Sequence, residues 1–106
     1  MLHWLALAGA IALEIGGTVS MKLSQGFTRV GPSIVTMVAV TVSFALLSIS
    51  MRTLPLGTAY TIWTGIGAVG AFVVGVVVLG EPLTAGRAIA AALIVTGLAL
   101  MKVSTA

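Results

Sequence analysis

Apolar residues fill long tracts of the chain, and short polar or turn-forming segments separate these tracts. Three tracts are almost free of charged residues, and a shorter one follows them: Leu2–Met21, Val30–Met51, Thr53–Gly80 and Ala88–Met101. A helix that crosses the hydrocarbon core needs about 20 predominantly apolar residues. The last tract reaches this length when flanking residues are included, because Arg87 and Lys102 can extend to the headgroups at opposite ends. We therefore predict four spanning helices at about 2–21, 33–51, 58–79 and 84–104.

The connections between these predicted helices are short and rich in turn-forming residues. "KLSQGFTRVG" (22–31) precedes Pro32, which suits the first turn of a helix. "TLPLG" (53–57) and "GEPLT" (80–84) form the other two connections. The first tract lacks a basic leading region and contains Glu14, so we expect it to be kept as a span rather than cleaved as a signal peptide. The prediction is one all-α transmembrane domain over residues 1–106 with no extramembrane domain.

Composition agrees with a membrane protein, since 59% of the residues are hydrophobic and only 7% are charged. A soluble domain carries about 25% charged residues. The net charge of +3 suits anionic headgroups but is too thinly spread to indicate nucleic acid. The absence of cysteine from the sequence excludes disulfides, thiolate ligands and thiol redox chemistry.

The basic residues of the connections specify almost no orientation. Lys22, Arg29 and Arg87 fall on one side of the predicted bundle, and Arg52 and Lys102 fall on the other with the N-terminal amine. Two interpretations stay open: one weakly specified orientation, or dual topology in which oppositely inserted copies pair.

Glu14 is the main candidate for chemistry, because a carboxylate in mid-membrane costs roughly 2.5–3.5 kcal/mol and normally faces a cavity or a partner. Its neighbours on one helical face include Ala10, Gly17 and Thr18, which leave room for an approaching ligand. The predicted span offers no basic residue at similar depth. Burial disfavours the charged form, so we expect Glu14 to exchange a proton for a cation. The alternative is a permanently neutral Glu that joins two helices by hydrogen bonds.

Two aromatic residues of the third predicted helix lie on one stripe. Tyr60 and Trp63 are three residues apart, and their rings can bind a cation with about 0.5–2 kcal/mol each. The alternative for Tyr60 is an interfacial aromatic belt. In the second helix Ser43 either lines the cavity or bonds back to its own helix. Gly65 and Gly67 form either a packing seam or a hinge.

The fourth predicted helix carries small residues along one side, Gly86, Ala90 and Gly97, which predict helix–helix packing. The sequence shows no nucleophile–base pair, phosphate loop or metal-ligand cluster, so we expect neither an enzyme nor a cofactor. Four helices around one Glu leave little room for a ligand. We therefore expect two copies, in which both Glu14 carboxylates converge on one chamber and alternate its access.

These residues and motifs resemble the small multidrug resistance family of proton-coupled exporters over essentially the whole chain. The resemblance rests on "LEIGGTVSMK", "GFTRVGPS", "LPLGTAYTIWTGIGAVGA" and the four-helix layout. It implies an antiparallel, dual-topology homodimer in the inner membrane, driven by the proton gradient. It also implies that Glu14 of both subunits binds protons or substrate, that Tyr60 and Trp63 line the cavity, that Gly65–Gly67 is a hinge, and that the last helix makes dimer contacts.

The sequence mixes features of different branches of this family. Guanidinium exporters typically carry Trp three residues after the Glu, where this chain has Gly17, and its helix resembles exporters of quaternary ammonium cations. "WTGIGAVGA", "GEPLTAGR" and Lys102 are similar to the guanidinium branch, and "MLHW" is similar to subunits of heteromeric pairs. Because Gly17 would widen the cavity beside Glu14, we expect export of lipophilic, aromatic and quaternary ammonium cations. The alternatives are a guanidinium exporter and a subunit of a heterodimer.

Two rivals belong to other classes of protein. A small proton or cation channel would use the same Glu14 without stoichiometric exchange. A membrane scaffold would use the seam of the last helix, but it gives no reason for an acid in mid-membrane.

Overall fold

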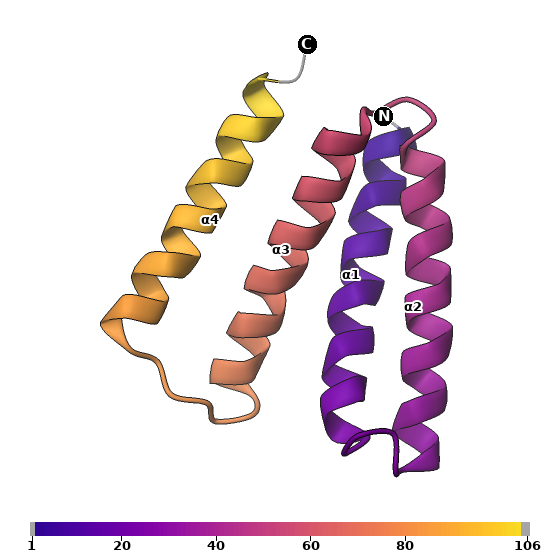
Figure 1. The fold of residues 1–106 in the computed structure, drawn as a ribbon, viewed down its shortest axis with the longest axis vertical. Coiled ribbons are helices and arrows are strands. Elements are labelled where there is room, and N and C mark those ends of the chain that lie inside the picture. The colour runs from indigo at the N-terminus through magenta and orange to yellow at the C-terminus, as the bar shows by residue number, and fades with distance from the viewer. Residues whose placement is uncertain (1, 105–106) are drawn as a thin grey trace.

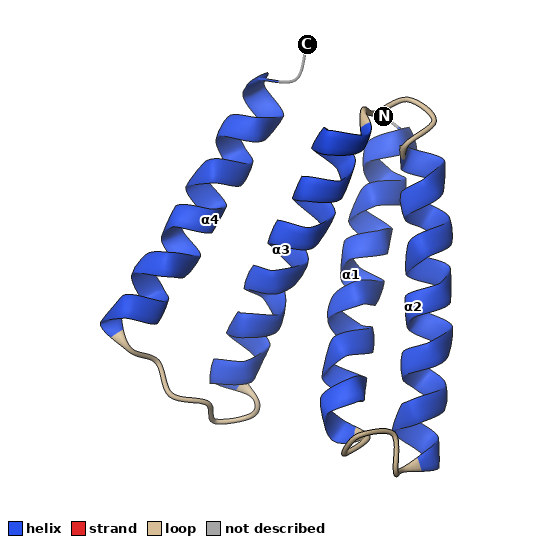
Figure 2. Ribbon diagram, in the orientation of Figure 1, coloured by secondary structure: helices blue, strands red, loops and turns tan. Residues whose placement is uncertain are grey.

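The computed structural model describes residues 2–104, which form four helices joined by short loops (Figures 1 and 2). The helices are α1 (Leu2–Leu23), α2 (Val30–Ser50), α3 (Leu56–Val77) and α4 (Ala85–Ser104). All four are long and apolar enough to cross a membrane. The predicted all-α architecture of four spans is therefore confirmed.

Two helices begin earlier than the sequence pattern predicts. α2 begins at Val30 rather than at residue 33, so Pro32 is its third residue. The first turn of a helix contains N–H groups without an intrahelical acceptor, so a proline there removes no helical hydrogen bond. α3 begins at Leu56, directly after Pro55 in an extended conformation, and ends two residues earlier than predicted, at Val77.

The helices lie side by side in a flat array with principal extents of 43 × 34 × 17 Å. The order across the array is α4, α3, α1, α2, as Figure 1 shows. α1 packs along α2, and α3 packs against both α1 and α4. Among the described residues, α4 has only α3 as a packing neighbour, apart from the Lys102 side chain, which reaches the Trp4 ring.

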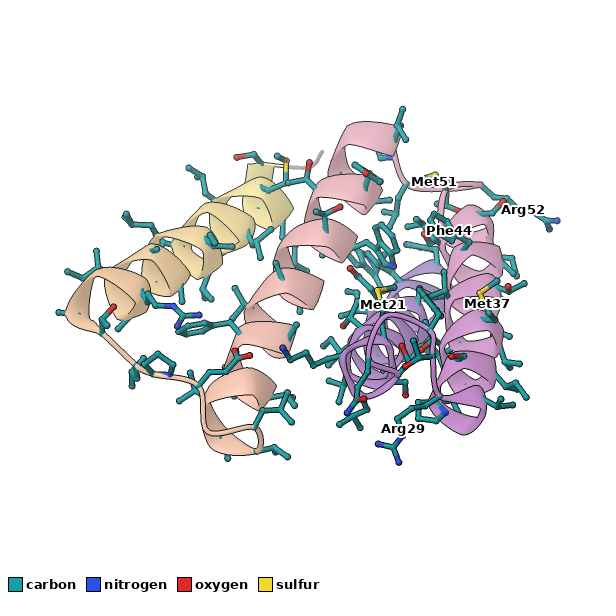
Figure 3. All side chains as sticks on the ribbon, turned by 60° about the horizontal axis from the view of Figure 1, so that its bottom comes forward. Met21, Arg29, Met37, Phe44, Met51 and Arg52 are labelled. Atoms are coloured by element: carbon teal, nitrogen blue, oxygen red, sulfur yellow. The ribbon has the colours of Figure 1, made fainter. Side chains whose placement is uncertain are left out.

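The contact between α1 and α2 is the most closely packed part of the array. α2 buries a stripe of residues spaced by three and four positions against α1: Thr36, Ala39, Ser43, Leu47 and Ser50. Glycines on α1 let the two backbones approach, because a Cβ at Gly9 would lie 3.2 Å from Leu46 and one at Gly17 would lie 3.2 Å from Val40. Met37, labelled in Figure 3, lies outside this stripe and is exposed.

Candidate functional site

Glu14 points from the middle of α1 towards α3, where it meets the backbone of Gly67. A Cβ at Gly67 would overlap the Glu14 carboxylate, so only glycine leaves the space that this side chain occupies. The Oε2 atom of Glu14 is buried and has no hydrogen-bond partner among residues 2–104. A buried polar atom without a partner is costly, so this oxygen is suited to receive a proton or a cation from outside the chain.

A chain of hydrogen bonds joins the three helices next to this carboxylate. The indole Nε1–H of Trp63 donates to the Ser43 hydroxyl over 3.1 Å, and that hydroxyl donates to the Ala10 carbonyl over 2.6 Å. All three residues are buried. Ala10 lies one helical turn before Glu14, so these bonds hold α2 and α3 at the depth of the carboxylate.

Two aromatic rings lie close to the indole of Trp63. The ring centroid of Phe44 lies 5.2 Å from that of Trp63, and the ring centroid of Tyr60 lies 5.6 Å away. Tyr60 is 49% exposed, whereas Trp63 is 8% exposed. The Tyr60 ring is therefore accessible from outside the chain and the Trp63 ring is enclosed, and cation binding by either ring stays a prediction.

Three buried hydroxyl side chains of α2, those of Thr36, Ser43 and Ser50, differ in their hydrogen-bond partners. Thr36 and Ser50 bond back to carbonyls of their own helix, over 2.9 and 2.7 Å. Only Ser43 bonds to another helix. The Ser43 hydroxyl bonds to α1 and α3, so the interpretation in which it bonds back to its own helix is wrong.

The sequence predicted that Gly17 widens the cavity beside Glu14, but in the structure Gly17 faces α2 instead. It is buried against α2, and a Cβ there would lie 3.2 Å from Val40 and 3.4 Å from Ala39. Residues three positions apart differ by about 60° around a helix, which turns Gly17 towards α2 while Glu14 faces α3. Thr18 donates its hydroxyl to the Ile15 carbonyl over 3.0 Å and lines a separate cavity with Lys22 and Glu81.

The glycines of α3 have close neighbours on both sides of that helix. A Cβ at Gly65 would lie 2.6 Å from Leu98 of α4, and a Cβ at Gly70 would overlap Ile15 of α1. α3 runs as one helix through Gly65 and Gly67. These contacts favour the packing seam, and the hinge stays a prediction.

The small residues of α4 face open space within the single chain. Apart from the neighbouring residues and backbone of α4 itself, a Cβ added at Gly86 or Gly97 would have no atom of the described residues within 4 Å, and Ala90 is exposed. Leu98, which inserts against Gly65, is the one buried residue of the described α4. The dimer contact of this helix stays a prediction, for which the open face leaves room.

Two residues with close contacts near the candidate site, Phe44 and Leu98, were not identified from the sequence. Phe44 pairs with Trp63, and its position directly after Ser43 was the available signal for an aromatic residue at the same depth. Leu98 connects α4 to α3, but one leucine among many apolar residues carries no signal of its own. Within residues 2–104, no group of three or more His, Asp or Glu residues could hold a metal ion.

Residues 2–94 match the sequence model of the Small Multidrug Resistance protein family. The chain belongs to this family. Among similar proteins, the guanidinium exporter of Citrobacter freundii is 48% identical over 104 residues, which cover 98% of this chain and 99% of that protein. The guanidinium exporter of Escherichia coli (strain K12) is 47% identical over 104 residues, with the same coverage of both chains.

Membership of the small multidrug resistance family, together with four apolar helices, makes this chain a multi-pass protein of the inner membrane. The predicted family is therefore confirmed, and its named relatives are exporters. The named relatives favour the guanidinium alternative over the expected export of lipophilic cations.

Proposed function

We propose that this protein is a proton-coupled exporter of guanidinium or small guanidinyl cations. The observation that carries the proposal is the buried Oε2 atom of Glu14, which has no partner among the described residues and lies against Gly67. Support also comes from the relatives named guanidinium exporters, which match nearly the whole chain.

The chemistry of this carboxylate suits a planar cation. Guanidinium presents N–H donors in a fork that matches the two oxygens of a carboxylate. The hydrogen-bonded chain of Trp63, Ser43 and Ala10 holds the surrounding helices in place, so the carboxylate meets its ligand in a fixed setting. A proton and a guanidinium ion compete for the same oxygens, and this competition couples the two fluxes.

Assembly as an antiparallel dimer is part of the proposal. One chain forms only a flat array, in which Tyr60 is half exposed and the small-residue side of α4 is open. Two oppositely inserted copies would enclose two Glu14 carboxylates, and the nearly balanced basic residues permit both insertions. A heterodimer with a homologous chain is the alternative assembly.

Export of lipophilic cations is the second candidate function, favoured by one specific observation. Phe44 and Tyr60 are 52% and 49% exposed, and the ring of each lies next to that of Trp63. Two partly exposed rings can stack on an aromatic cation. Gly17 no longer supports this candidate through cavity width, because it lies against α2.

Proton-coupled currents in proteoliposomes test these functions. We expect currents with guanidinium and none with tetraphenylphosphonium, and we expect Glu14→Gln to abolish them. The reverse selectivity would establish the second candidate. Uphill flux driven by a pH gradient separates the exporter from a channel. Silence with both cations, from folded protein, would overturn the homodimer and indicate a missing homologous subunit.

A further inference from the structure

A second feature of the molecule lies between α3 and α4, away from Glu14. A cavity of about 440 Å³ separates these helices, within the range of ordinary ligand sites. Aliphatic side chains form its walls: Ile62, Ile66 and Val69 from α3, and Val95 and Ala99 from α4. Such a surface binds hydrocarbon.

This groove faces away from the cation site. Tyr60, Thr61 and Thr64 of α3 line a different cavity between the same two helices. At 100° per residue, these three lie on the opposite side of α3 from Ile62 and Ile66. Leu98 inserts against Gly65 and lines both cavities, which places it between them.

One end of the groove carries a positive charge beside an indole. The Lys102 Nζ atom lies 5.2 Å from the ring centroid of Trp4, and both residues line the cavity. None of the residues that line it is acidic. Trp4 and Lys102 stand near opposite chain ends, at the membrane–water interface of their spans, where tryptophan and lysine anchor helices.

We propose that this groove binds an anionic phospholipid, with one acyl chain between α3 and α4 and the phosphate paired with Lys102. The aliphatic walls match the chain, and the single cation stands at the depth of the headgroup, where each lysine adds about 1 kcal/mol of attraction for anionic lipid. A cationic substrate is disfavoured in this groove, because Lys102 would repel it.

Lipid retention measured by native mass spectrometry tests the proposal. Protein is reconstituted in equal amounts of phosphatidylglycerol and phosphatidylcholine and extracted in mild detergent before the retained lipids are weighed. Lys102→Gln removes the charge, and Ala99→Phe fills the groove. Arg52→Gln is the matched control, because Arg52 is a basic residue on the same side of the bundle and does not line the groove.

We expect the wild type and Arg52→Gln to prefer phosphatidylglycerol. Lys102→Gln should lower the ratio of the two retained lipids about fivefold, which corresponds to ~1 kcal/mol. Ala99→Phe should reduce retention of both lipids while the protein stays folded and dimeric.

Equal retention of both lipids by the wild type would overturn the proposal, as would an equal change in Arg52→Gln. Dissociation of the dimer in Ala99→Phe with unchanged lipid retention would assign the groove to a second copy of the chain. These outcomes are independent of the proposed export function, because Lys102 and Ala99 lie outside the cation site.

Discussion

The two glutamates of this chain can be compared directly, because each side chain lies against a glycine of α3. Glu14 occupies the space beside Gly67, and Glu81 occupies the space beside Gly75, about two helical turns further along. Both glycines are buried, and a Cβ at either position would overlap the neighbouring carboxylate. In both places, a glycine without a side chain leaves the space that the carboxylate occupies.

Their surroundings differ. Glu14 is in the middle of α1, which has no Lys or Arg before Lys22. Glu81 follows the end of α3, where Gly80 turns the chain with a φ of 71° and the Glu81 N–H donates to the Gly75 carbonyl over 2.9 Å. Glu81 shares cavities with Lys22, Arg29 and Arg87.

The difference shows that a glycine contact makes room for a carboxylate, whereas the neighbouring charges determine what the carboxylate can do. Glu81, at a helix end, has basic side chains lining the same cavities. An acid without cations in mid-membrane has to obtain its neutralising charge from a mobile ion.

Of the substitutions that test this comparison, Glu14→Gln should have the largest effect on transport. The amide keeps the shape of the side chain but cannot exchange a proton, so pH-gradient-driven export should vanish while the dimer and helix content stay normal. Substrate binding to the wild type should weaken as pH falls, because protons compete for the carboxylate. Proteoliposome currents and equilibrium binding at several pH values measure both effects, and gradient-driven export by Glu14→Gln would contradict the proposed coupling.

Gly67→Ala should have the next largest effect. The added methyl group overlaps the Glu14 carboxylate and should destabilise the fold by about 1–3 kcal/mol, with loss of substrate affinity. Gly75→Ala is the matched control, since Glu81 at the helix end can move aside into water. Thermal unfolding in detergent and guanidinium binding compare the two variants, and equal loss of binding would show that the contact at Gly67 has no special role.

Ser43→Ala should have a moderate effect. It removes the link between Trp63 and Ala10 and should cost about 1 kcal/mol, as hydrogen bonds between membrane helices do. Ser50→Ala, which removes only a bond within α2, is the control. Unfolding in a denaturing detergent measures stability, and tryptophan fluorescence reports on the indole of Trp63 together with that of Trp4; a Trp4→Phe background isolates the Trp63 signal.

Glu81→Gln should have the smallest effect. Its carboxylate is near the helix end, so we expect a change within about 0.5 kcal/mol in stability and the same pH dependence of substrate binding as in the wild type. A flattened pH profile in this variant would place Glu81 in the proton pathway and remove the contrast with Glu14. Equilibrium binding of substrate at several pH values, as for Glu14→Gln, measures this pH dependence.

The sequence by itself determined the membrane location, the four helices and the presence of an acid in mid-span. These conclusions follow from local properties: the length of the apolar tracts, the scarcity of charge and the cost of burying Glu14 in mid-span. The pairing of Tyr60 with Trp63 also follows from helical spacing within one segment. Helix starts were less predictable, because a proline is compatible with more than one position in the first turn.

Only the tertiary structure decided which face of each helix meets which neighbour. Gly17 and Glu14 are three residues apart, and both belong to the small-residue side of α1, yet one faces α2 and the other faces α3. The bond from Trp63 to Ser43 joins residues 20 positions apart, and the insertion of Leu98 beside Gly65 joins two different helices. Such contacts depend on the relative rotation and spacing of packed helices, which the pattern within any single helix leaves undetermined.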